Sequence, residues 1–418
     1  MTVPGIRRGL VSSAMADSVA ASLPLASVGE GVAIITRAGT RIPAVVSRVD
    51  GAEVFLVAFA PLQGVSVGDG VESSPEVLRL GLGVELLGRA VDADAKPIDG
   101  RGPIHGRRSP IIDPPIAAGE RTPIVEPLWT GIRAIDALLT IGRGARIGIF
   151  GPPAAGKSTL IEMLVRSAVA DAIVVALIGE RGREAAEWLQ DIRPHTTLVV
   201  APLDCSPAER VRGAQVALAQ GSQLRRRGLN VLVILDSLAR FAAAARELAV
   251  SKGESVGRGG YSPSVFAEMA RLLERGGNAH GGSLTLIATV LSDGPEEHDP
   301  LSEAARAALD GHIVLSRTLA QSGQFPAIDI AMSASRTMAA IISPAHRAAA
   351  RRVRAAIVLL AETREIRELG FVPDNPLLDR ALGIESRLRD FLRQDERAVA
   401  PERTLADLQS LGKELDVR

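Results

Sequence analysis

One short segment combines the residue types that bind a phosphate chain. Residues 151–158 fit the pattern G-x-x-x-x-G-K-[ST], between the apolar stretch 147–150 and a stretch with apolar residues at helical spacing. Backbone N–H groups and a helix N-terminus bind phosphate oxygens, a lysine neutralises β- and γ-phosphates, and a hydroxyl binds Mg²⁺. The segment therefore predicts a site for ATP and Mg²⁺. The predicted nucleotide-binding residues are Gly151, Pro152, Pro153, Ala154, Ala155, Gly156, Lys157, Ser158 and Thr159.

A Mg²⁺ ion held beside ATP needs a further ligand, which should be a carboxylate at the end of a buried strand. Asp236 directly follows the apolar stretch 231–235. An aspartate at this place can also simply end a strand, but the presence of a phosphate loop in the same chain favours a metal role. The predicted metal ligands are therefore Ser158 and Asp236.

Hydrolysis also requires a group that orients and polarises water. Glu180 follows the apolar stretch 172–178, one crossover after the phosphate loop, and Arg181 is next to it. In a doubly wound α/β sheet, ligands bind at the carboxyl ends of the strands. A solvated Glu/Arg turn is the alternative for an isolated segment. Its position in the chain favours a catalytic role beside the γ-phosphate.

The elements that must position these residues are visible as runs of apolar residues. Runs that are apolar at every position predict strands buried on both faces, as in a parallel sheet covered by helices. They lie at 147–150, 172–178, 198–200, 231–235 and 284–290. The fold class predicted for this part is therefore α/β.

The flanking parts of the chain have different patterns. Short β-rich runs with Gly-containing turns predict a small β-barrel, whereas Ala, Arg and Leu at helical spacings after Pro344 predict a helical domain. The predicted domains are an N-terminal extension at 1–25, the barrel at 26–88, the nucleotide domain at 89–343 with a linker at 89–127, and the helical domain at 344–418.

The composition excludes several classes of protein. The 418 residues carry 48 basic and 48 acidic side chains, so no global positive charge favours nucleic-acid binding. The single cysteine, Cys205, cannot form an internal disulfide, which favours a reducing compartment. No stretch reaches the roughly 18 apolar residues of a membrane span. Serines interrupt the N-terminal apolar segment, which favours a short amphipathic or mobile extension over a signal peptide.

Taken together, these residues resemble the export ATPases of type III (injectisome) secretion and their flagellar counterparts, in the rotary F/V superfamily. The resemblance covers nearly the whole chain and rests on eight motifs in order. They are Leu87–Arg89 with Pro97–Gly100, Thr130–Asp136 with Gly142–Gly144, Gly179–Glu184, Leu235–Phe241, Gly260–Phe266, Asp310–Arg317, Phe325–Asp329 and Ser333–Arg336. It implies a central RecA-like P-loop domain with a parallel sheet, a small N-terminal β-barrel and a C-terminal helical domain.

The resemblance also implies roles for single residues, with Lys157, Glu180, Arg181 and Arg336 as the catalytic set. Glu180 matches the family's water-activating glutamate, and Arg181 the arginine beside it near the γ-phosphate. Arg336 matches the arginine finger that reaches into the neighbouring subunit's site. Phe325 takes the place of an aromatic residue that stacks on adenine, where tyrosine is common.

The activity implied is ATP hydrolysis at the subunit interfaces of a homohexameric ring, which energises the release and unfolding of substrates by a type III secretion apparatus. The implied partners are a central stalk, stator or regulator proteins, export substrates and chaperones, with no nucleic acid. The implied location is cytoplasmic, peripherally associated with the inner membrane.

Three other assignments are open to test. An RNA-driven motor resembling Rho shares the Pro-Pro and Phe-Pro-Ala-Ile-Asp features, but residues before 85 offer only Phe55 and Phe59 for base stacking. A non-catalytic nucleotide-binding subunit typically has Gln in place of Glu180. Within the export family, the short extension of about 25 residues favours the injectisome type over the flagellar type.

Overall fold

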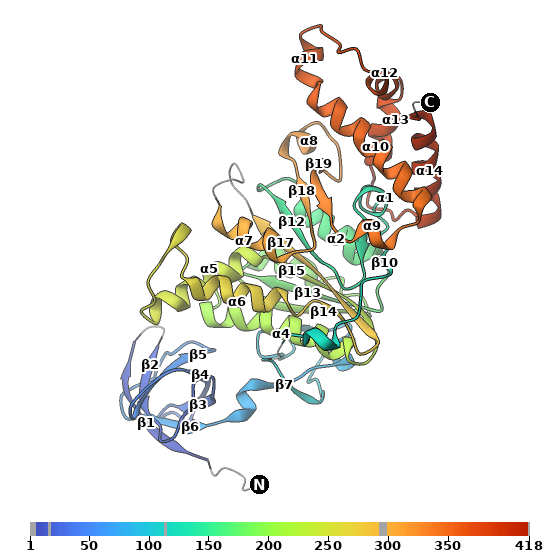
Figure 1. The fold of residues 1–418 in the computed structure, drawn as a ribbon. Helices are drawn as coiled ribbons and strands as arrows, with labels where there is room; N and C mark the ends of the chain where they lie inside the picture. The colour runs from blue at the N-terminus through green and yellow to red at the C-terminus, as the bar shows by residue number, and fades with distance from the viewer. Residues whose placement is uncertain (1–5, 16–17, 113–114, 292–298, 417–418) are drawn as a thin grey trace. The chain divides into compact units, whose positions relative to one another are not determined.

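The structure is a computed structural model that describes residues 6–15, 18–112, 115–291 and 299–416 (Figure 1). These residues form two compact units, and each unit is built from several chain segments. The first unit contains 1–115, 174–224 and 235–272, and the second contains 116–173, 225–234 and 273–418.

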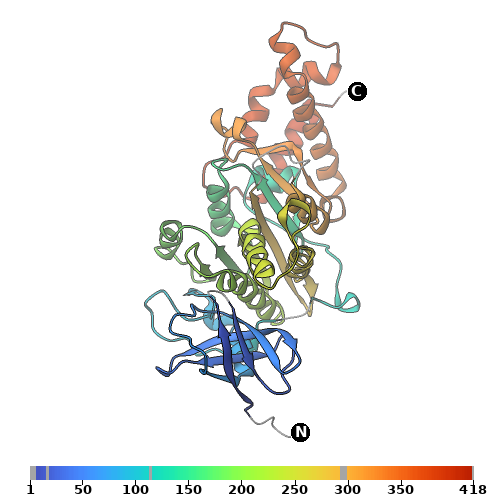
Figure 2. The same ribbon diagram turned by 90° about the vertical axis from the view of Figure 1, so that its left-hand side faces the viewer.

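The first unit begins with a closed six-stranded barrel in the order β1-β2-β5-β4-β3-β6 (Figure 2). Side chains alternate between its inside and outside: in β4, Ile42, Ala44 and Val46 are buried and their neighbours are more exposed. The β-rich runs therefore form the barrel that the sequence predicted. Its strands are β1 (Arg8–Ala14), β2 (Val19–Ser22), β3 (Gly31–Ile35), β4 (Arg41–Asp50), β5 (Glu53–Ala58) and β6 (Gly70–Ser73).

The barrel includes residues that the sequence assigned to an N-terminal extension at 1–25. Strand β1 pairs with β2 and β6, and Val11, Val19 and Ala21 lie in the barrel core. The serines that interrupt the apolar run explain the difference, because they occupy the outer face of β1. Ser12 is exposed there and its hydroxyl donates a hydrogen bond to Oε1 of Glu53 at 2.7 Å.

A linker connects the barrel with the rest of the first unit. Within its 87–100 motif, the Arg89 guanidinium donates to both carboxylate oxygens of Asp99, at 2.7 and 3.0 Å, and this pairing holds the pKa of Asp99 well below its usual range. Strand β7 pairs with β9, and β8 runs parallel to β14. These strands are β7 (Arg79–Gly81), β8 (Ala90–Val91), β9 (Arg108–Pro110) and β14 (Thr196–Ala201), and the helices of this unit are α3 (Gly182–Leu189), α4 (Pro207–Arg225), α5 (Leu238–Ser251) and α6 (Pro263–Leu273).

The central sheet follows the strand order β19-β18-β12-β17-β15-β13-β14-β8, with β16 paired to β17. Strands β13 (Ala172–Ile178), β15 (Asn230–Asp236) and β17 (Gly282–Leu291) are buried at nearly every position, as the apolar runs predicted. Its other strands in the second unit are β12 (Arg146–Gly151), β16 (Gly277–Ala279), β18 (Gly311–Leu315) and β19 (Ile328–Ser335). Strands β10 (Pro127–Leu128) and β11 (Ile141–Gly142) pair with each other in a separate two-stranded sheet. The α/β fold class is therefore confirmed.

Strand β12 leads into the phosphate loop and is fixed in the second unit by an ion pair. It runs parallel to β17 and β18. At its start, the backbone N–H of Arg146 donates to Asp310 Oδ2 at 2.9 Å, and its guanidinium donates to both Asp310 oxygens at 3.1 Å. Asp310 opens the 310–317 motif, so this motif anchors the strand that carries the loop.

The C-terminal part is helical, as predicted (Figure 1). Helix α10 starts with Ser343 as its N-cap, whose hydroxyl accepts a hydrogen bond from the His346 N–H at 3.2 Å. Gly412 in α14 allows a close approach to α10, because a Cβ there would lie 3.0 Å from Ala349. The α-helices of the second unit, with those of the C-terminal part last, are α1 (Arg133–Leu138), α2 (Lys157–Ser167), α7 (Pro300–Ala308), α8 (Arg317–Gln321), α9 (Met338–Ile341), α10 (Pro344–Glu362), α11 (Arg364–Glu368), α12 (Pro376–Gly383), α13 (Glu385–Leu392) and α14 (Pro401–Glu414). Among the described helices, none is both long enough and apolar enough to cross a membrane.

Candidate active site

The predicted phosphate loop has the local geometry of an anion-binding turn. Strand β12 ends at Gly151 and helix α2 begins at Lys157. Between them, Ala154 and Gly156 have φ values of +64° and +85°, in the left-handed region. Such a turn before a helix N-terminus directs successive backbone N–H groups toward one point, where they can bind phosphate oxygens.

The residues around this turn divide into buried and exposed sets. Ala155 is buried, and α2 buries Leu160 and Leu164 on its inner face. Ser158 and Thr159, on the first turn of α2, are exposed. The loop is therefore held by its apolar residues, and the hydroxyl groups that would contact phosphate and metal remain accessible.

Phe325 lies against the phosphate loop. A Cβ placed on Gly156 would be 3.5 Å from Cε1 of Phe325, an ordinary van der Waals distance, so the ring lies directly beside the loop. Phe325 is 44% exposed, so part of its ring is accessible to a ligand. Its position fits an aromatic face that receives a base, and it is the residue that the sequence singled out for this role.

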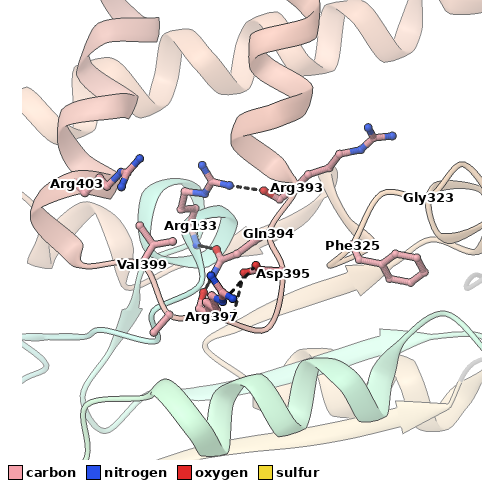
Figure 3. A pocket seen from close by; sticks show the side chains of 10 residues that line it. Arg133, Gly323, Phe325, Arg393, Gln394, Asp395, Arg397, Val399 and Arg403 are labelled. Atoms are coloured by element: carbon pink, nitrogen blue, oxygen red, sulfur yellow. Dashed lines mark hydrogen bonds and ion pairs between the residues drawn. The ribbon is translucent and has the colours of Figure 1, made fainter.

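A cavity of about 580 Å³ adjoins Phe325 (Figure 3). Gln394 forms part of its wall and is fully engaged: Nε2 donates to the carbonyls of Gly131 at 2.7 Å and Arg397 at 2.8 Å, and Oε1 accepts from the Arg133 N–H at 2.9 Å. The wall consists of Arg133, Gly323, Phe325, Arg393, Gln394, Asp395, Arg397, Ala398, Val399 and Arg403. Four arginines against one aspartate make it an electropositive cavity.

A buried carboxylate shapes the loop to which Gln394 binds. Asp136 accepts hydrogen bonds from the N–H and hydroxyl of Thr130, at 2.8 and 2.7 Å, and from the Gly131 N–H at 2.9 Å. Burial raises the pKa of Asp136 to about 6. The 130–136 motif therefore holds the Gly131 carbonyl in place for Gln394. The sequence did not predict this function, because the two partners are 263 residues apart.

The predicted water-activating glutamate lies in the first unit. Glu180 follows β13 and is only 4% exposed. Arg240, in α5, places Nη2 3.4 Å from Glu180 Oε2 and donates a hydrogen bond through Nη1 to the Gly179 carbonyl. Ser237 caps the same helix and accepts from the Arg240 N–H at 3.3 Å. Arg240 therefore fixes the Glu180 carboxylate, a contact that no pattern in the sequence predicted.

Arg181 differs from Arg240 although it is adjacent to Glu180 in sequence. Its side chain is 77% exposed, and Nη1 lies 3.9 Å from Oε1 of Glu184. A surface pair of this kind contributes little to stability. The described contacts therefore give the positioning role to Arg240, and the role of Arg181 at the γ-phosphate stays a prediction.

Asp236 ends strand β15, as the sequence predicted, and its side chain is 6% exposed. Carboxylate and hydroxyl oxygens suit Mg²⁺, which is commonly held by one or two protein ligands together with substrate phosphates. Asp236 and Ser158 fit this donor set. Within the described residues, no group of three or more His, Cys, Asp or Glu side chains is placed to hold a metal ion.

Arg336 directly follows β19 and is exposed. Its backbone N–H donates to the Asp310 carbonyl at 2.9 Å. Within the described residues its guanidinium has no ion-pair or hydrogen-bond partner. The sequence predicted that this arginine acts in a neighbouring subunit, and its side chain is accessible for such a role.

Comparison with known families matches two parts of the chain. Residues 131–335 match the nucleotide-binding domain of the ATP synthase alpha/beta family. Residues 342–410 match the C-terminal domain of the type III secretion ATPase EscN.

Curated relatives of both export systems are similar over most of their length. The flagellum-specific ATP synthase of Salmonella typhimurium is 42% identical over 365 residues, covering 82% of this chain and 79% of the relative. The type 3 secretion system ATPase of Sinorhizobium fredii is 40% identical over 410 residues, covering 94% and 89%.

Solved structures agree with these similarities. Assembled EscN from enteropathogenic E. coli matches with a TM-score of 0.90 at 35% identity, covering 97% of this chain and 100% of that chain. The assembled EscN in complex with its central stalk EscO matches with a TM-score of 0.88 at the same identity and coverage.

Proposed function

The chain belongs to the ATP synthase alpha/beta family, among the type III secretion and flagellar export ATPases, and on this premise we propose that it hydrolyses ATP between the subunits of a homohexameric ring. The phosphate loop, with Phe325 against Gly156, carries the proposal. In this arrangement the phosphate loop binds the triphosphate, and the adjacent exposed ring of Phe325 receives the base.

Each residue of the proposed site has a defined task. Backbone N–H groups of 151–156 and the ammonium of Lys157 bind the β- and γ-phosphates. Phe325 stacks on adenine. Ser158 and Asp236 would hold Mg²⁺, which would neutralise charge on the phosphate oxygens when bound. These assignments are supported by the donor types and by the positions of the residues at strand ends and at the start of α2.

Attack by water requires an oriented base. Glu180 accepts a hydrogen bond from the water and aligns it with the γ-phosphorus, while Arg240 keeps the carboxylate in one orientation. Burial supports this task, because a carboxylate shielded from bulk solvent and fixed by a guanidinium has little freedom to turn away. A glutamate at this position favours a catalytic subunit over one that only binds nucleotide.

Arg336 completes the site from a neighbouring subunit. Its guanidinium stabilises negative charge on the γ-phosphoryl oxygens in the transition state. Its exposure and lack of a partner among the described residues support this assignment. The assembled state of the similar EscN structure is consistent with the ring.

The work done by this hydrolysis is the release and unfolding of export substrates at a type III secretion apparatus. The flagellar and injectisome relatives have nearly equal identity, 42% and 40%, so the proposal covers the export activity that both share. Its partners would be a central stalk, as EscO is for EscN, together with stator or regulator proteins, substrates and chaperones. The proposed location is the cytoplasmic side of the inner membrane, with peripheral attachment.

The test measures ATPase activity against protein concentration, with and without RNA. Sites shared between subunits should give a specific activity that rises steeply with concentration, because dilution separates each site from its Arg336. RNA should have no effect. Specific activity independent of concentration would contradict the shared site, and stimulation by RNA would favour the Rho-type motor.

A further inference from the structure

Strand β19, which leads into Arg336, contains a bulge. In the antiparallel pair of β18 and β19, the residues on either side of Ile313 pair with Ala334 and Asp329. One residue of β18 therefore corresponds to four residues of β19, 330–333. A bulge bends its strand and changes the direction of the side chains beyond it, and bulges are common beside active sites. The direction in which Arg336 leaves the sheet therefore depends on how this bulge is held.

Side chains provide hydrogen bonds within the bulge. The Ser333 hydroxyl accepts from the Val314 N–H at 2.9 Å and donates to the Asp329 carbonyl. Asp329 Oδ1 accepts from the Met332 N–H at 3.1 Å, and His312 Nε2 donates to the Met332 carbonyl at 3.0 Å. These bonds connect specific atoms, so the bulge has one defined conformation and is not a loosely paired stretch of strand.

Helix α10 holds the bulge from its other side through Arg354. Among the described strands, β19 comes last in the order of the central sheet, so carbonyls on its outer edge need partners from elsewhere. Arg354 is half-buried, and its Nη2 donates to the Ser333 carbonyl and, at 3.4 Å, to the Ala331 carbonyl. These two carbonyls precede Arg336 by three and five positions. One guanidinium therefore connects the bulge to the C-terminal helices.

Packing between α10 and this segment is incomplete. A cavity of about 300 Å³ is bordered by Ser335 and Met338 on one side and by Arg351 and Arg354 of α10 on the other. Filled interiors resist displacement because each side chain contacts many others, whereas the lining of a cavity lacks part of those contacts. The position of the segment that carries Arg336 therefore depends more on hydrogen bonds from α10 than it would in a filled core.

We propose that Arg354 is a positioning residue for Arg336: by fixing the bulge of β19, it sets the direction of the Arg336 guanidinium. This inference rests on the proposed function, in which Arg336 acts at the γ-phosphate of a neighbouring subunit. Arg354 acts through Arg336 and contacts no substrate atom. Misplacement of a catalytic group by about 1 Å can cost about 10²-fold in rate, so the bonds of Arg354 to the bulge affect turnover.

The first test is a double-mutant cycle in the full chain. Arg354→Met should lower kcat about 10- to 50-fold with little change in KM for ATP, because a misdirected guanidinium stabilises the transition state less well. Arg354→Lys should recover part of this loss, since an ammonium can still donate to a carbonyl. Arg336→Ala combined with Arg354→Met should be no slower than Arg336→Ala alone.

The matched control is Arg352→Met, on the same helix, where Arg352 pairs with Asp416 at 3.0 Å. Its turnover should stay within about twofold of the natural chain. Additive losses in the double variant would overturn the proposal, because Arg354 would then act on the fold as a whole and not through Arg336. If Arg354→Met does not fold, Arg354→Lys takes its place in the cycle.

Mixed rings show which subunit needs Arg354. A Glu180→Gln subunit supplies Arg336 to the site of an Arg336→Ala subunit, so mixing the two should restore activity. Adding Arg354→Met to the Glu180→Gln subunit should reduce this recovery about tenfold or more, whereas adding it to the Arg336→Ala subunit should leave the recovery within about twofold. A merely structural role would lower both recoveries equally, and that result would overturn the proposal.

The parent mixture separates this inference from the proposed function. If the mixture of Glu180→Gln and Arg336→Ala regains no activity, the shared site is contradicted, and the double-mutant cycle alone decides the role of Arg354. If the parent mixture regains activity and the two Arg354→Met mixtures do not differ, the shared site stands and the positioning role of Arg354 is wrong.

Discussion

The surroundings of Glu180 and of Arg336 differ in the side-chain partners that one chain provides. Glu180 is buried, and Arg240 of the same chain fixes its carboxylate. Arg336 is exposed and, among the described residues, its guanidinium has no partner. Folding of one chain is therefore enough to position the Glu180 carboxylate. The Arg336 guanidinium, in contrast, is accessible to another chain. In the proposed mechanism, one part of the chemistry therefore depends on the folding of a single chain, whereas another part depends on assembly.

The largest effect is expected from Arg336→Ala. Turnover should fall by about 10³-fold or more, because the transition state loses the charge that a neighbour supplies. ATP binding at low concentration should be retained, and the dependence of specific activity on protein concentration should vanish. The measurement is steady-state hydrolysis over a dilution series.

A matched control is Arg364→Ala, another exposed arginine, which pairs with Glu368 at the surface of α11. It should stay within about twofold of the natural chain, as exposed pairs contribute little. If Arg336→Ala kept more than a tenth of the turnover, the proposed catalytic role of Arg336 in a neighbouring subunit would be contradicted.

Glu180→Gln is expected to have the next largest effect. Turnover should fall by about 10² to 10⁴, because the amide cannot accept the proton or polarise the water, while ATP should still bind. Single-turnover hydrolysis and equilibrium nucleotide binding separate the two steps. The neighbouring Glu184→Gln is the control, since Glu184 contacts only the exposed Arg181 in the described ion pairs, and it should be nearly normal.

Mixing the two inactive variants sharpens the comparison further. In a mixed ring, a Glu180 from an Arg336→Ala subunit can meet an Arg336 from a Glu180→Gln subunit. Random mixing at equal amounts should complete about one interface in four and restore a corresponding part of the activity. An arginine that acted within its own chain would give no recovery of activity. If mixing restores no ATPase activity, Arg336 therefore acts within its own chain, as Arg240 does.

The sequence was informative where a function depends on neighbouring residues in the chain. The loop at 151–158 is contiguous, and its backbone geometry follows from small residues between a strand and a helix. Asp236 and Glu180 were predicted as site residues because each lies at the carboxyl end of an apolar strand. The serines of β1 were misleading, because polar residues on the outer face of a barrel strand have the same composition as an extension.

Functions that depend on tertiary contacts could not be found in this way. Arg240 meets Glu180 across 60 positions, and Gln394 meets Gly131 across 263, with no pattern in the sequence that joins them. Arg181 was predicted to act near the γ-phosphate because it is adjacent to Glu180 and matches the family's arginine there, whereas no pattern in the sequence pointed to a role for Arg240. Side-chain direction, which places one arginine on the carboxylate and the other in solvent, is decided by packing.

A smaller effect is expected from Arg240→Lys. Turnover should fall about 10- to 100-fold with little change in KM, because an ammonium cannot bridge Glu180 and the Gly179 carbonyl as the guanidinium does. A positioning role predicts strong non-additivity: Glu180→Gln combined with Arg240→Lys should be no slower than Glu180→Gln alone. Additive losses would show that Arg240 acts on the substrate directly and not through Glu180.

The smallest effect is expected from Phe325→Leu, which tests a third contact that one chain completes by itself. Loss of stacking on adenine should raise KM for ATP about five- to tenfold with nearly constant kcat. KM for inorganic triphosphate, which has no base, should not change, and Phe371→Leu at another exposed phenylalanine should leave both substrates unaffected. Because Phe325 meets the loop of its own chain, the rise in KM should be the same at every protein concentration. A rise that grew on dilution would instead assign Phe325, like Arg336, to the contact between subunits.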